Sequence, residues 1–432
     1  MAKQNNTSRK KVLIIGAGIA GLAACKQLLE YGFDAKILEA QDRVGGRILT
    51  DTRFGISLGL GASFIHGDKD NPITTLAEKY GAKRVAVNPD KFIFLDHNGK
   101  FIPQSIINEF NIKFSTLLEQ AKEFALSSST DVALSVSMLP FIDKIPFSSI
   151  EKELLKTRLL ALEGYLGASC SSLSGRYWDE EQTWPGDNCL LINSYQPIIN
   201  GLEKDCPVQL KSNVKKINIV NENIEVTTEH EIFNSDAVII TVPLGVLKRN
   251  QISINPSLPR QKIEAVQRLG MGLFNITAIK FATSFWPKDS HAIFLPKYDD
   301  LDIPVFLNLY QFTKEPLLIG HSGGNSAFEL EKFSNTELQE RIMAGFKRIF
   351  GDNIPTPENF ITTRWSQNEF SHGSYSYLPP KAHMGDYGIL AEPFMNKIFF
   401  AGEATHSQFP ATTHGAYLSG IREAERIKDL LL

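Results

Sequence analysis

Cysteine, excess charge and long apolar runs are all scarce in this sequence of 432 residues. Its four cysteines stand far apart without a CxxC pair, which argues against a disulfide framework and against a zinc site. A net charge of −3 gives no reason to expect a nucleic-acid partner. No apolar stretch is long enough to span a bilayer. We therefore expect no metal site, no nucleic-acid or membrane partner, and a cytoplasmic location.

What is present is the composition of an ordinary globular protein. Hydrophobic residues make up 43% of the chain and charged residues 22%, and the length favours two domains. The polar, basic start leads into an apolar run that superficially resembles the hydrophobic region of a signal peptide. We reject that interpretation because the glycines of the run stand at the spacing that phosphate binding requires.

That apolar run predicts a strand, a glycine turn and a helix. Residues 12–15 are all apolar and lead directly into GAGIAG at residues 16–21, after which apolar residues recur at helical spacing. In such a turn Gly16 permits the tight bend, Gly18 lets the backbone approach a pyrophosphate, and Gly21 lets the helix pack on the strand. The unpaired N–H groups of the helix N-terminus attract the anion.

A second predicted strand completes a dinucleotide-binding unit. Residues 35–38 lead into Glu39, roughly 20 residues after the glycine turn, where an acidic side chain binds a ribose hydroxyl. The same acid argues against a 2′-phosphate, so NADP is disfavoured. A glycine turn alone would be weak support, since any tight turn from strand to helix uses glycine. The two strands, the helix and the acid together favour dinucleotide binding.

A second glycine turn extends this pattern to a family. Residues 43–47, RVGGR, carry arginines suited to phosphate oxygens. The order GAGIAGL, Glu39, RVGGR resembles the opening of the flavin-dependent amine oxidases, which bind FAD. Residues 58–67, LGLGASFIHG, are similar to a segment of the polyamine oxidase branch that lies along the flavin ring. The resemblance implies cofactor contacts at the positions Arg47, Gly61 and Ala62.

His66 lies in that segment, where the polyamine oxidase branch places a residue facing the substrate. A lone histidine is more often a satisfied core or surface residue. The motif favours a role in the site, with a basic or polar group directed at an amine.

The last segment contains a second match to the same branch. Residues 398–406, IFFAGEATH, predict a strand ending in Gly-Glu, and residues 412–420, TTHGAYLSG, predict a helix that begins after Gly415. GEATH and TTHGA resemble the polyamine oxidase motif closely. The resemblance implies that Gly402, Glu403 and Thr413 hold the ribityl, pyrophosphate and pyrimidine parts of FAD.

Three further positions follow from the resemblance. Val214, on a predicted strand, corresponds to a position that packs near the adenine in the family, although a valine there would be core in any Rossmann-like protein. Trp365 and Tyr375 lie in RWS and GSYSY segments that resemble a cage beside the flavin. An aromatic face at Tyr375 suits an amine because it guides the cation and excludes water. The alternative is that Tyr375 and Tyr377 alternate in a strand and only pack.

Glu163 is a third candidate on the substrate side. It lies at the end of a predicted helix, residues 150–166, in a stretch similar to one in polyamine oxidases and histone lysine demethylases. Glu163 would hold a cationic amine, or would be a solvated acid on a helix surface, and the sequence does not decide between the two.

One position departs from the family. Aligning FWP at residues 285–287 puts Ile276 where most amine oxidases carry a lysine that is linked through a water to flavin N5. Lys280 lies four residues on, about 13 Å along an extended strand, and is no obvious substitute. The departure leaves FAD binding untouched but makes oxygen an uncertain electron acceptor.

Together these observations predict an α/β protein, with a Rossmann-like FAD-binding domain and an interleaved substrate-binding domain of mixed sheet and helices. We expect the FAD domain at 1–80, 204–250 and 385–432, and the substrate domain at 81–203 and 251–384. The resemblance implies oxidation of a polyamine-like amine by hydride transfer to flavin N5, with oxygen or another electron acceptor. The alternatives are an amine dehydrogenase with a non-oxygen acceptor, and a non-catalytic FAD-binding scaffold.

Overall fold

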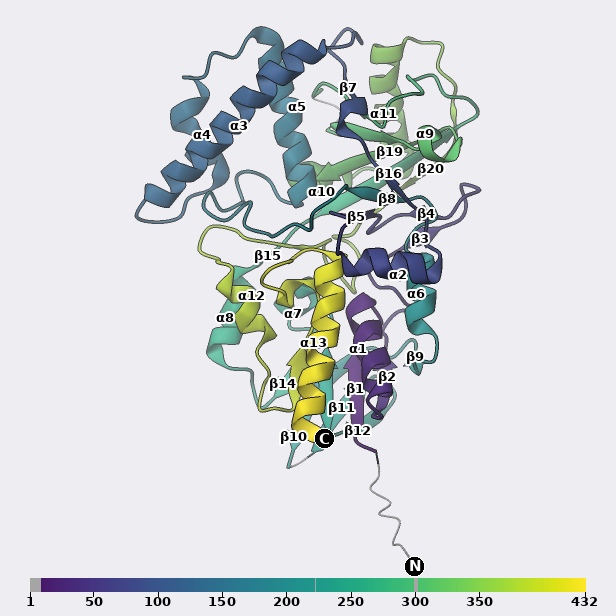
Figure 1. Ribbon diagram of the computed structural model, residues 1–432, viewed down its shortest axis with the longest axis vertical. Helices are drawn as coiled ribbons and strands as arrows, with labels where there is room; N and C mark the ends of the chain where they lie inside the picture. The colour runs from purple at the N-terminus through teal and green to yellow at the C-terminus, as the bar shows by residue number, and fades with distance from the viewer. Residues whose placement is uncertain (1–8, 222, 299–301) are drawn as a thin grey trace, which may run out of the picture.

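The computed structural model describes residues 9–221, 223–298 and 302–432, so most of the polar start lies outside the described residues. The chain folds into two halves, one containing both described ends and the other containing most of the middle of the chain (Figure 1). Among the described residues, no helix combines the length and the apolar character needed to cross a membrane.

A five-stranded parallel sheet forms the centre of the half that contains the ends, with the strand order β22-β13-β1-β2-β9. Its strands are β1 (Lys11–Ile15), β2 (Asp34–Leu38), β9 (Val208–Gln209), β13 (Ala237–Ile240) and β22 (Ile398–Phe400). The strands β13 and β22 are buried throughout, as expected when both faces of a parallel sheet are covered. Sequentially distant strands are neighbours here, so this half of the molecule is assembled from both ends of the chain.

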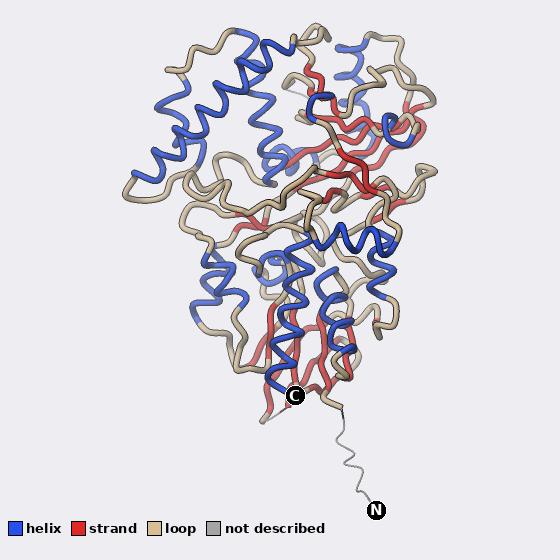
Figure 2. Tube along the Cα trace, in the orientation of Figure 1, coloured by secondary structure: helices blue, strands red, loops and turns tan. Residues whose placement is uncertain are grey.

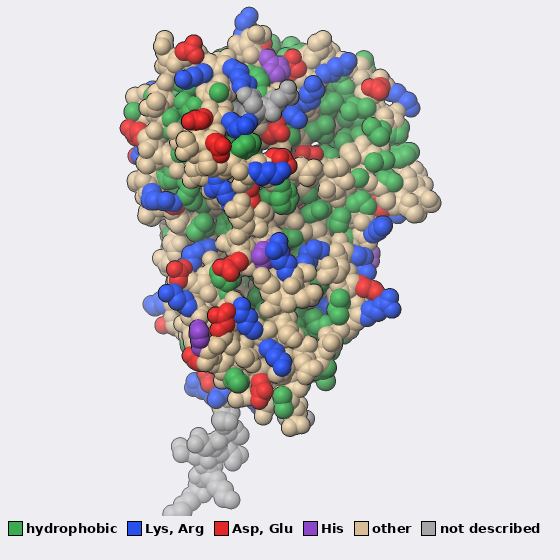
Figure 3. Space-filling view, turned by 180° about the vertical axis from the view of Figure 1, so that it is seen from behind, with side chains coloured by type: hydrophobic (Ala, Val, Ile, Leu, Met, Phe, Trp, Pro, Cys, Tyr) green, Lys and Arg blue, Asp and Glu red, His purple; other side chains and the backbone are tan. Residues whose placement is uncertain are grey.

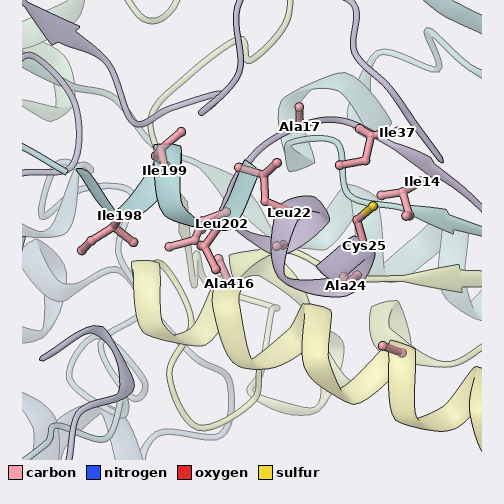
Figure 4. Close-up of a cluster of buried hydrophobic side chains, with 14 of the residues drawn as sticks. Ile14, Ala17, Leu22, Ala24, Cys25, Ile37, Ile198, Ile199, Leu202 and Ala416 are labelled. Atoms are coloured by element: carbon pink, nitrogen blue, oxygen red, sulfur yellow. The ribbon is translucent and has the colours of Figure 1, made fainter. Parts of the chain in front are cut away.

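Helices cover one face of this sheet. The first helix, α1 (Ile19–Glu30), lies beside the last, α13 (Thr413–Leu431), and α6 (Gln196–Glu203) packs on α1 (Figures 1 and 4). The approach of α1 and α13 is close because a Cβ added at Gly420 would lie 2.1 Å from the carbonyl oxygen of Ala20. The apolar cluster between them includes Leu22 and Leu202, both 2% exposed or less.

A mixed sheet, antiparallel except for its β10–β14 pair, covers the other face. Its order is β12-β11-β10-β14, and its strands are β10 (Val214–Val220), β11 (Asn223–Thr228), β12 (Ile232–Ser235) and β14 (Ser253–Asn255). Leu13 and Ile15 of β1 pack against Ile217 and Val226 of this sheet. Alternate residues of β1 therefore face the two layers, as the period of a strand requires.

The second half is built on a six-stranded mixed sheet with helices on both sides (Figure 2). Its strands, in spatial order, are β20 (Pro357–Thr362), β16 (Phe274–Phe281), β19 (Leu317–Gly323), β18 (Val305–Asn308), β17 (Ala292–Phe294) and β7 (Phe92–Phe94). The helices α3 (Gln104–Ser127), α4 (Leu134–Ile142) and α5 (Ser149–Leu166) lie on one side and α11 (Asn335–Phe350) on the other, and α10 (Gly324–Leu330) follows β19 and contacts α5.

The surface of α3 and α4 is unusually apolar for exposed helices. Ile112, Leu126, Val136 and Leu139 are each 46% or more exposed. Seen from the opposite face, hydrophobic side chains gather toward the side of the molecule on which these helices lie (Figure 3).

The remaining elements are short and lie around or between the two large sheets. They are β3 (Thr50–Asp51), β4 (Leu58–Gly59), β5 (Phe64–Ile65), α2 (Pro72–Tyr80), β6 (Arg84–Ala86), η1 (Pro89–Lys91), β8 (Cys189–Leu191), α7 (Leu244–Lys248), α8 (Arg260–Arg268), β15 (Gly270–Met271), α9 (Tyr310–Thr313), β21 (Ser376–Tyr377), α12 (Gly385–Ala391) and η2 (Glu403–Thr405). The three-stranded sheet β5-β8-β6 and the pair β15-β21 lie between the two large sheets.

The predicted strand-turn-helix-strand unit is confirmed as β1, α1 and β2. Two elements differ from the predicted division of the chain. α6, which we expected with the substrate domain, packs on α1, and β14, which we also expected there, pairs with β10. Both elements therefore pack with the half that contains the chain ends.

Candidate active site

Two adjoining cavities lie where the halves meet. The larger has a volume of about 520 Å³ and the smaller about 100 Å³. Both are lined by Gly18, Arg47, Thr241 and Trp365, so one continuous depression runs from the parallel sheet to the mixed sheet of the other half. Of the predicted cofactor residues, the larger cavity also contains Gly61, Ala62, Gly402, Glu403 and Thr413, and the smaller contains Gly16, Glu39 and Val214.

The glycine turn after β1 has the geometry its sequence predicts. Gly16 has φ +105°, which favours glycine, and its N–H donates to the carbonyl of Leu38. A Cβ at Gly21 would lie 2.0 Å from the carbonyl oxygen of Gly16, so the third glycine allows the helix to pack on the turn. A Cβ at Gly18 would meet no protein atom within 4 Å. The packing of the protein therefore does not require glycine at position 18, and its missing side chain leaves space open in the cavity.

Glu39 is held at the end of β2 in the smaller cavity. Its carboxylate accepts the N–H of Ala17 at 2.6 Å and of Gln41 at 2.8 Å, and its side chain is almost fully buried. Those two bonds fix the carboxylate beside the glycine turn. A carboxylate oxygen has two lone pairs, so acceptor capacity remains for a hydroxyl group.

The arginines of the RVGGR turn differ from each other. The guanidinium of Arg43 donates to the carbonyls of Val44, Gly46 and Ile48, so it fixes the turn and is not directed at phosphate oxygens as expected. Arg47 faces both cavities, and its Nη1 is 2.8 Å from Oε1 of Glu403. The RVGGR pattern by itself does not show which of the two arginine side chains points into a cavity, because their direction depends on the backbone conformation of the turn.

The motif at the chain end also borders the cavity. Glu403 accepts from Ser376 Oγ at 2.6 Å and from the N–H of Ala411 at 3.0 Å, in addition to Arg47. α13 begins at Thr413, three residues before the predicted start, because the side chain of Thr412 caps it by accepting the N–H of Gly415. The N-termini of α1 and α13 therefore both point at the larger cavity, and helix N-termini favour anions.

This set of groups fits FAD. The open space at Gly18 leaves room for a pyrophosphate at the N-terminus of α1, and Glu39 offers an acceptor to a ribose hydroxyl. Arg47 and Glu403 stand between the two cavities, where a flexible polyhydroxyl chain would need both a donor and an acceptor. The larger cavity is mostly apolar, as a flavin ring requires.

His66 and Tyr375 come together in the wall of the larger cavity. The hydroxyl of Tyr375 donates to the carbonyls of Gly164 at 3.1 Å and Tyr165 at 3.0 Å, at the end of α5. The ring of Tyr165 meets His66 edge-on with centroids 5.8 Å apart, and His66 stacks on Phe64 at 5.9 Å. Burial lowers the pKa of His66, so its imidazole is neutral at pH 7. Tyr165 thus links the two predicted residues.

Glu163 does not join them. Its carboxylate accepts the N–H of Cys170 at 2.8 Å, and it lines a separate crevice with His97, Lys156 and Lys297. The cavity is lined instead by Ala161, Gly164 and Tyr165 of the same helix. Residues three and four apart share a helix face, and residue 163 lies on another, so the helical period turns Glu163 away from the cavity.

Two titratable residues in the cavity wall were not predicted. Glu181 follows α5 in a stretch without regular structure, and burial raises its pKa to about 7. His321 lies on β19, with its ring 5.0 Å from that of Phe274, and burial lowers its pKa to about 4. For Glu181 the sequence held a weak indication of a place in the site, since it ends the segment YWDEE at residues 177–181. His321 had none, because its place depends on the pairing of β16 with β19.

That pairing also explains the surroundings of Ile276. Ile276 is directly opposite His321 in the β16–β19 register and is 1% exposed within the apolar core. Lys280 donates to the carbonyl of Phe54 at 2.9 Å and pairs with Glu315 at 2.8 Å, and it does not line the cavity. Lys280 therefore does not take the place of the family lysine.

Three histidines have low pKa values in the folded protein. We therefore predict that the free energy of unfolding falls in mild acid. Burial lowers the pKa of His321 and His406 to about 4 and that of His414 to about 3, whereas an unfolded histidine has a pKa of about 6.5. Between these values the unfolded chain binds more protons than the folded chain. The free energy of unfolding should therefore fall as the pH falls from about 6.5 toward about 4, by at most about 1.4 kcal/mol per pH unit for each histidine.

Urea unfolding followed from about pH 7 to about pH 5 measures this slope. His321→Leu should make it shallower, whereas His230→Leu, at an exposed histidine, should leave it unchanged. An equal slope in all three proteins would contradict the assignment of the acid sensitivity to the buried histidines.

Comparison with known proteins places this geometry in context. A family model described as flavin containing amine oxidoreductase matches residues 19–428. Polyamine oxidase 2 of Arabidopsis thaliana is 33% identical over 97% of this chain and 88% of its own length. Lysine-specific histone demethylase 1 homolog 2 of Oryza sativa subsp. japonica is 34% identical over 96% of this chain but 56% of its own length. A solved structure of a putrescine oxidase double mutant, redesigned for cofactor binding, has the same fold, with TM-score 0.78, 19% identity, and 97% and 99% of the two chains covered.

Proposed function

We propose that this chain, which belongs to the flavin containing amine oxidoreductase family, oxidises a polyamine-like primary or secondary amine at the carbon beside its nitrogen. Membership confirms the predicted Rossmann-like fold, the FAD cofactor and the class of enzyme. The observation that carries the finer proposal is the larger cavity, in which Gly18 and Glu403 of the dinucleotide site line the same space as the aromatic residues His66, Tyr165 and Tyr375. The names of the relatives support a small amine substrate.

FAD, when bound, supplies the acceptor for a hydride from that carbon. The residues of the chain hold the cofactor at Gly18, Glu39 and Glu403 and orient the amine against the aromatic wall. An amine reacts when its nitrogen lone pair is free to stabilise the forming C=N bond, so it must be neutral. A mostly apolar cavity favours the neutral form because burial disfavours the charged one.

The product of this step is an imine, and water then adds to its carbon. Hydrolysis releases an aldehyde, together with ammonia from a primary amine or a shorter amine from a secondary one. The hydroxyl of Tyr375 is committed to two backbone carbonyls, so its ring acts as a fixed wall and its proton is not offered to the substrate. The neutral imidazole of His66 can accept a hydrogen bond or donate one, according to its tautomer.

Oxygen is the electron acceptor we favour, giving hydrogen peroxide. Ile276 supports the alternative, a dehydrogenase that passes electrons to a different acceptor, because the buried isoleucine offers no polar group where the family carries lysine. The histone demethylase relatives are much longer than this chain, and we propose a small-molecule amine as the substrate.

An anaerobic titration tests the proposal. Spermine, spermidine, acetylated polyamines, putrescine and simple aromatic amines are added to the holoenzyme while the flavin band at about 450 nm is followed, and air is then admitted. We expect a polyamine or diamine to bleach the band and air to restore it within seconds. Bleaching that persists in air would favour the dehydrogenase. No bleaching with any amine would contradict amine oxidation at this site.

A further inference from the structure

The larger cavity has two unlike walls. One wall is polar and aromatic, from His66, Tyr165, Glu181 and Asn188. A second part of the lining comes from β7, β17, β18 and the loops that flank them, and it is apolar. Its residues are Val87, Pro89, Phe92, Ala292, Phe294, Pro304, Val305 and Leu307. An ammonium group placed against the apolar wall would lose its water without gaining a partner.

Charged groups in the cavity are few. Among the described lining residues, the carboxylates are Glu181 and Glu403, and the single arginine is Arg47. The charge of Glu403 is already paired with the guanidinium of Arg47, and Glu403 also accepts from Ser376 and from the N–H of Ala411. Within the described chain, Glu181 makes no ion pair, and its one polar contact is the hydroxyl of Tyr165 at a long 3.5 Å. Glu181 is the carboxylate still able to receive a cation.

Of three consecutive acidic residues, only Glu181 lines the cavity. Asp179 and Glu180 lie just before it, and both pair with Lys122 of α3, at 2.7 and 2.9 Å. The third acid faces the cavity instead, beside the hydroxyl of Tyr165. The segment that carries Glu181 is held in place because the N–H of Gln182 donates to the carbonyl of Gln408.

We propose that Glu181 binds one ammonium group of the substrate and that the cavity provides no second position for a cation. The inference rests on the proposed function and narrows it. The substrate is an amine with one reacting nitrogen, one further cationic nitrogen bound at Glu181, and an apolar chain between them against β7, β17 and β18. Aromatic faces of Tyr165 and Trp178 add favourable surroundings for the cation.

The raised pKa of Glu181 is consistent with this role. Burial without a cationic partner raises that pKa to about 7, and an ammonium beside the carboxylate would lower it again. The free site therefore holds a carboxyl group that is ready to ionise when a cation arrives.

The test uses two amines of equal length, hexylamine and 1,6-diaminohexane, together with spermidine and spermine. Binding is measured from tryptophan fluorescence of the anaerobically reduced holoenzyme, in which the amine cannot be oxidised, and kcat/KM is measured separately. We expect the diamine to bind at least 10-fold more tightly than hexylamine, and spermidine and spermine to bind no more tightly than the diamine.

Glu181→Gln should remove the preference for the diamine while changing hexylamine binding less than about 3-fold. Glu180→Gln is the matched control, since it makes the same change one residue away on the Lys122 side, and it should alter neither amine. Glu181→Lys should instead favour 6-aminohexanoate, a gain that a misfolded variant would not show.

Equal losses of hexylamine and diamine binding in Glu181→Gln would overturn the inference, as would spermine binding more tightly than the diamine in the native protein. Neither outcome would contradict the proposal that the protein oxidises an amine. That proposal is tested separately, by the flavin titration of the oxidised holoenzyme, and it would be contradicted if no amine bleached the flavin.

Discussion

Replacing Gly18 with valine is expected to lower the affinity for FAD about 100-fold or more while the protein still folds. Gly18 has φ −71° and ψ 174°, an extended conformation that valine adopts readily, and its added Cβ meets no protein atom within 4 Å. The new side chain would occupy the space at the N-terminus of α1 that a pyrophosphate needs. The cost to the apoprotein is small, about 1 kcal/mol for a poorer helix cap.

Flavin fluorescence titration of the apoprotein measures the affinity, and urea unfolding of the same apoprotein measures the stability. Gly388→Ala is the control, because a Cβ at Gly388 in α12 also meets no protein atom within 4 Å and lies outside both cavities. It should keep normal FAD affinity. Normal FAD affinity in Gly18→Val would show that the cofactor does not approach the backbone at this turn.

Removing the carboxylate of Glu403 should have the second large effect, on both stability and cofactor binding. Glu403 is 4% exposed and accepts from Arg47 at 2.8 Å and from Ser376 Oγ at 2.6 Å. Glu403→Ala leaves the Arg47 charge without its partner, which is expected to lower the free energy of unfolding by about 3 kcal/mol or more. Glu403→Gln keeps the shape and one acceptor oxygen, so it should lose less, about 1 to 3 kcal/mol.

Denaturant unfolding of the apoprotein separates this effect from cofactor loss. The double variant Arg47→Met/Glu403→Leu should recover part of the stability because no charge remains unpaired. Glu78→Ala, at an exposed pair with Arg84, should change stability by less than about 1 kcal/mol. If Glu403→Ala were no worse than Glu78→Ala, the pair with Arg47 would have no structural role.

The sequence predicted the parts of the fold whose determinants are local. The apolar residues of β1, the glycines after it and Glu39 lie close together in the chain, and their spacing alone specifies the turn. The chain-end motif was predicted for the same reason, although the capping side chain of Thr412 moved the start of α13 to Thr413.

The parts that were missed depend on orientation or on distant pairing. Glu163 lies in a recognisable motif, but the helical period directs it away from the wall that Gly164 and Tyr165 form. Glu181 stands in an irregular stretch, where no period tells which of three consecutive acids turns inward. His321 reaches the cavity through the register of β19 against β16, and no local pattern encodes that register.

The partnership of α1 and α13 has a consequence for how the protein is made. The strand and turn that begin the dinucleotide site are made well before the helix that completes it, because β1 and α13 lie far apart in the chain. A growing chain therefore exposes part of the apolar face of β1 and α1 until α13 has also been made. The cavity gains the residues at the start of α13, Thr413 among them, only once that helix has packed on α1.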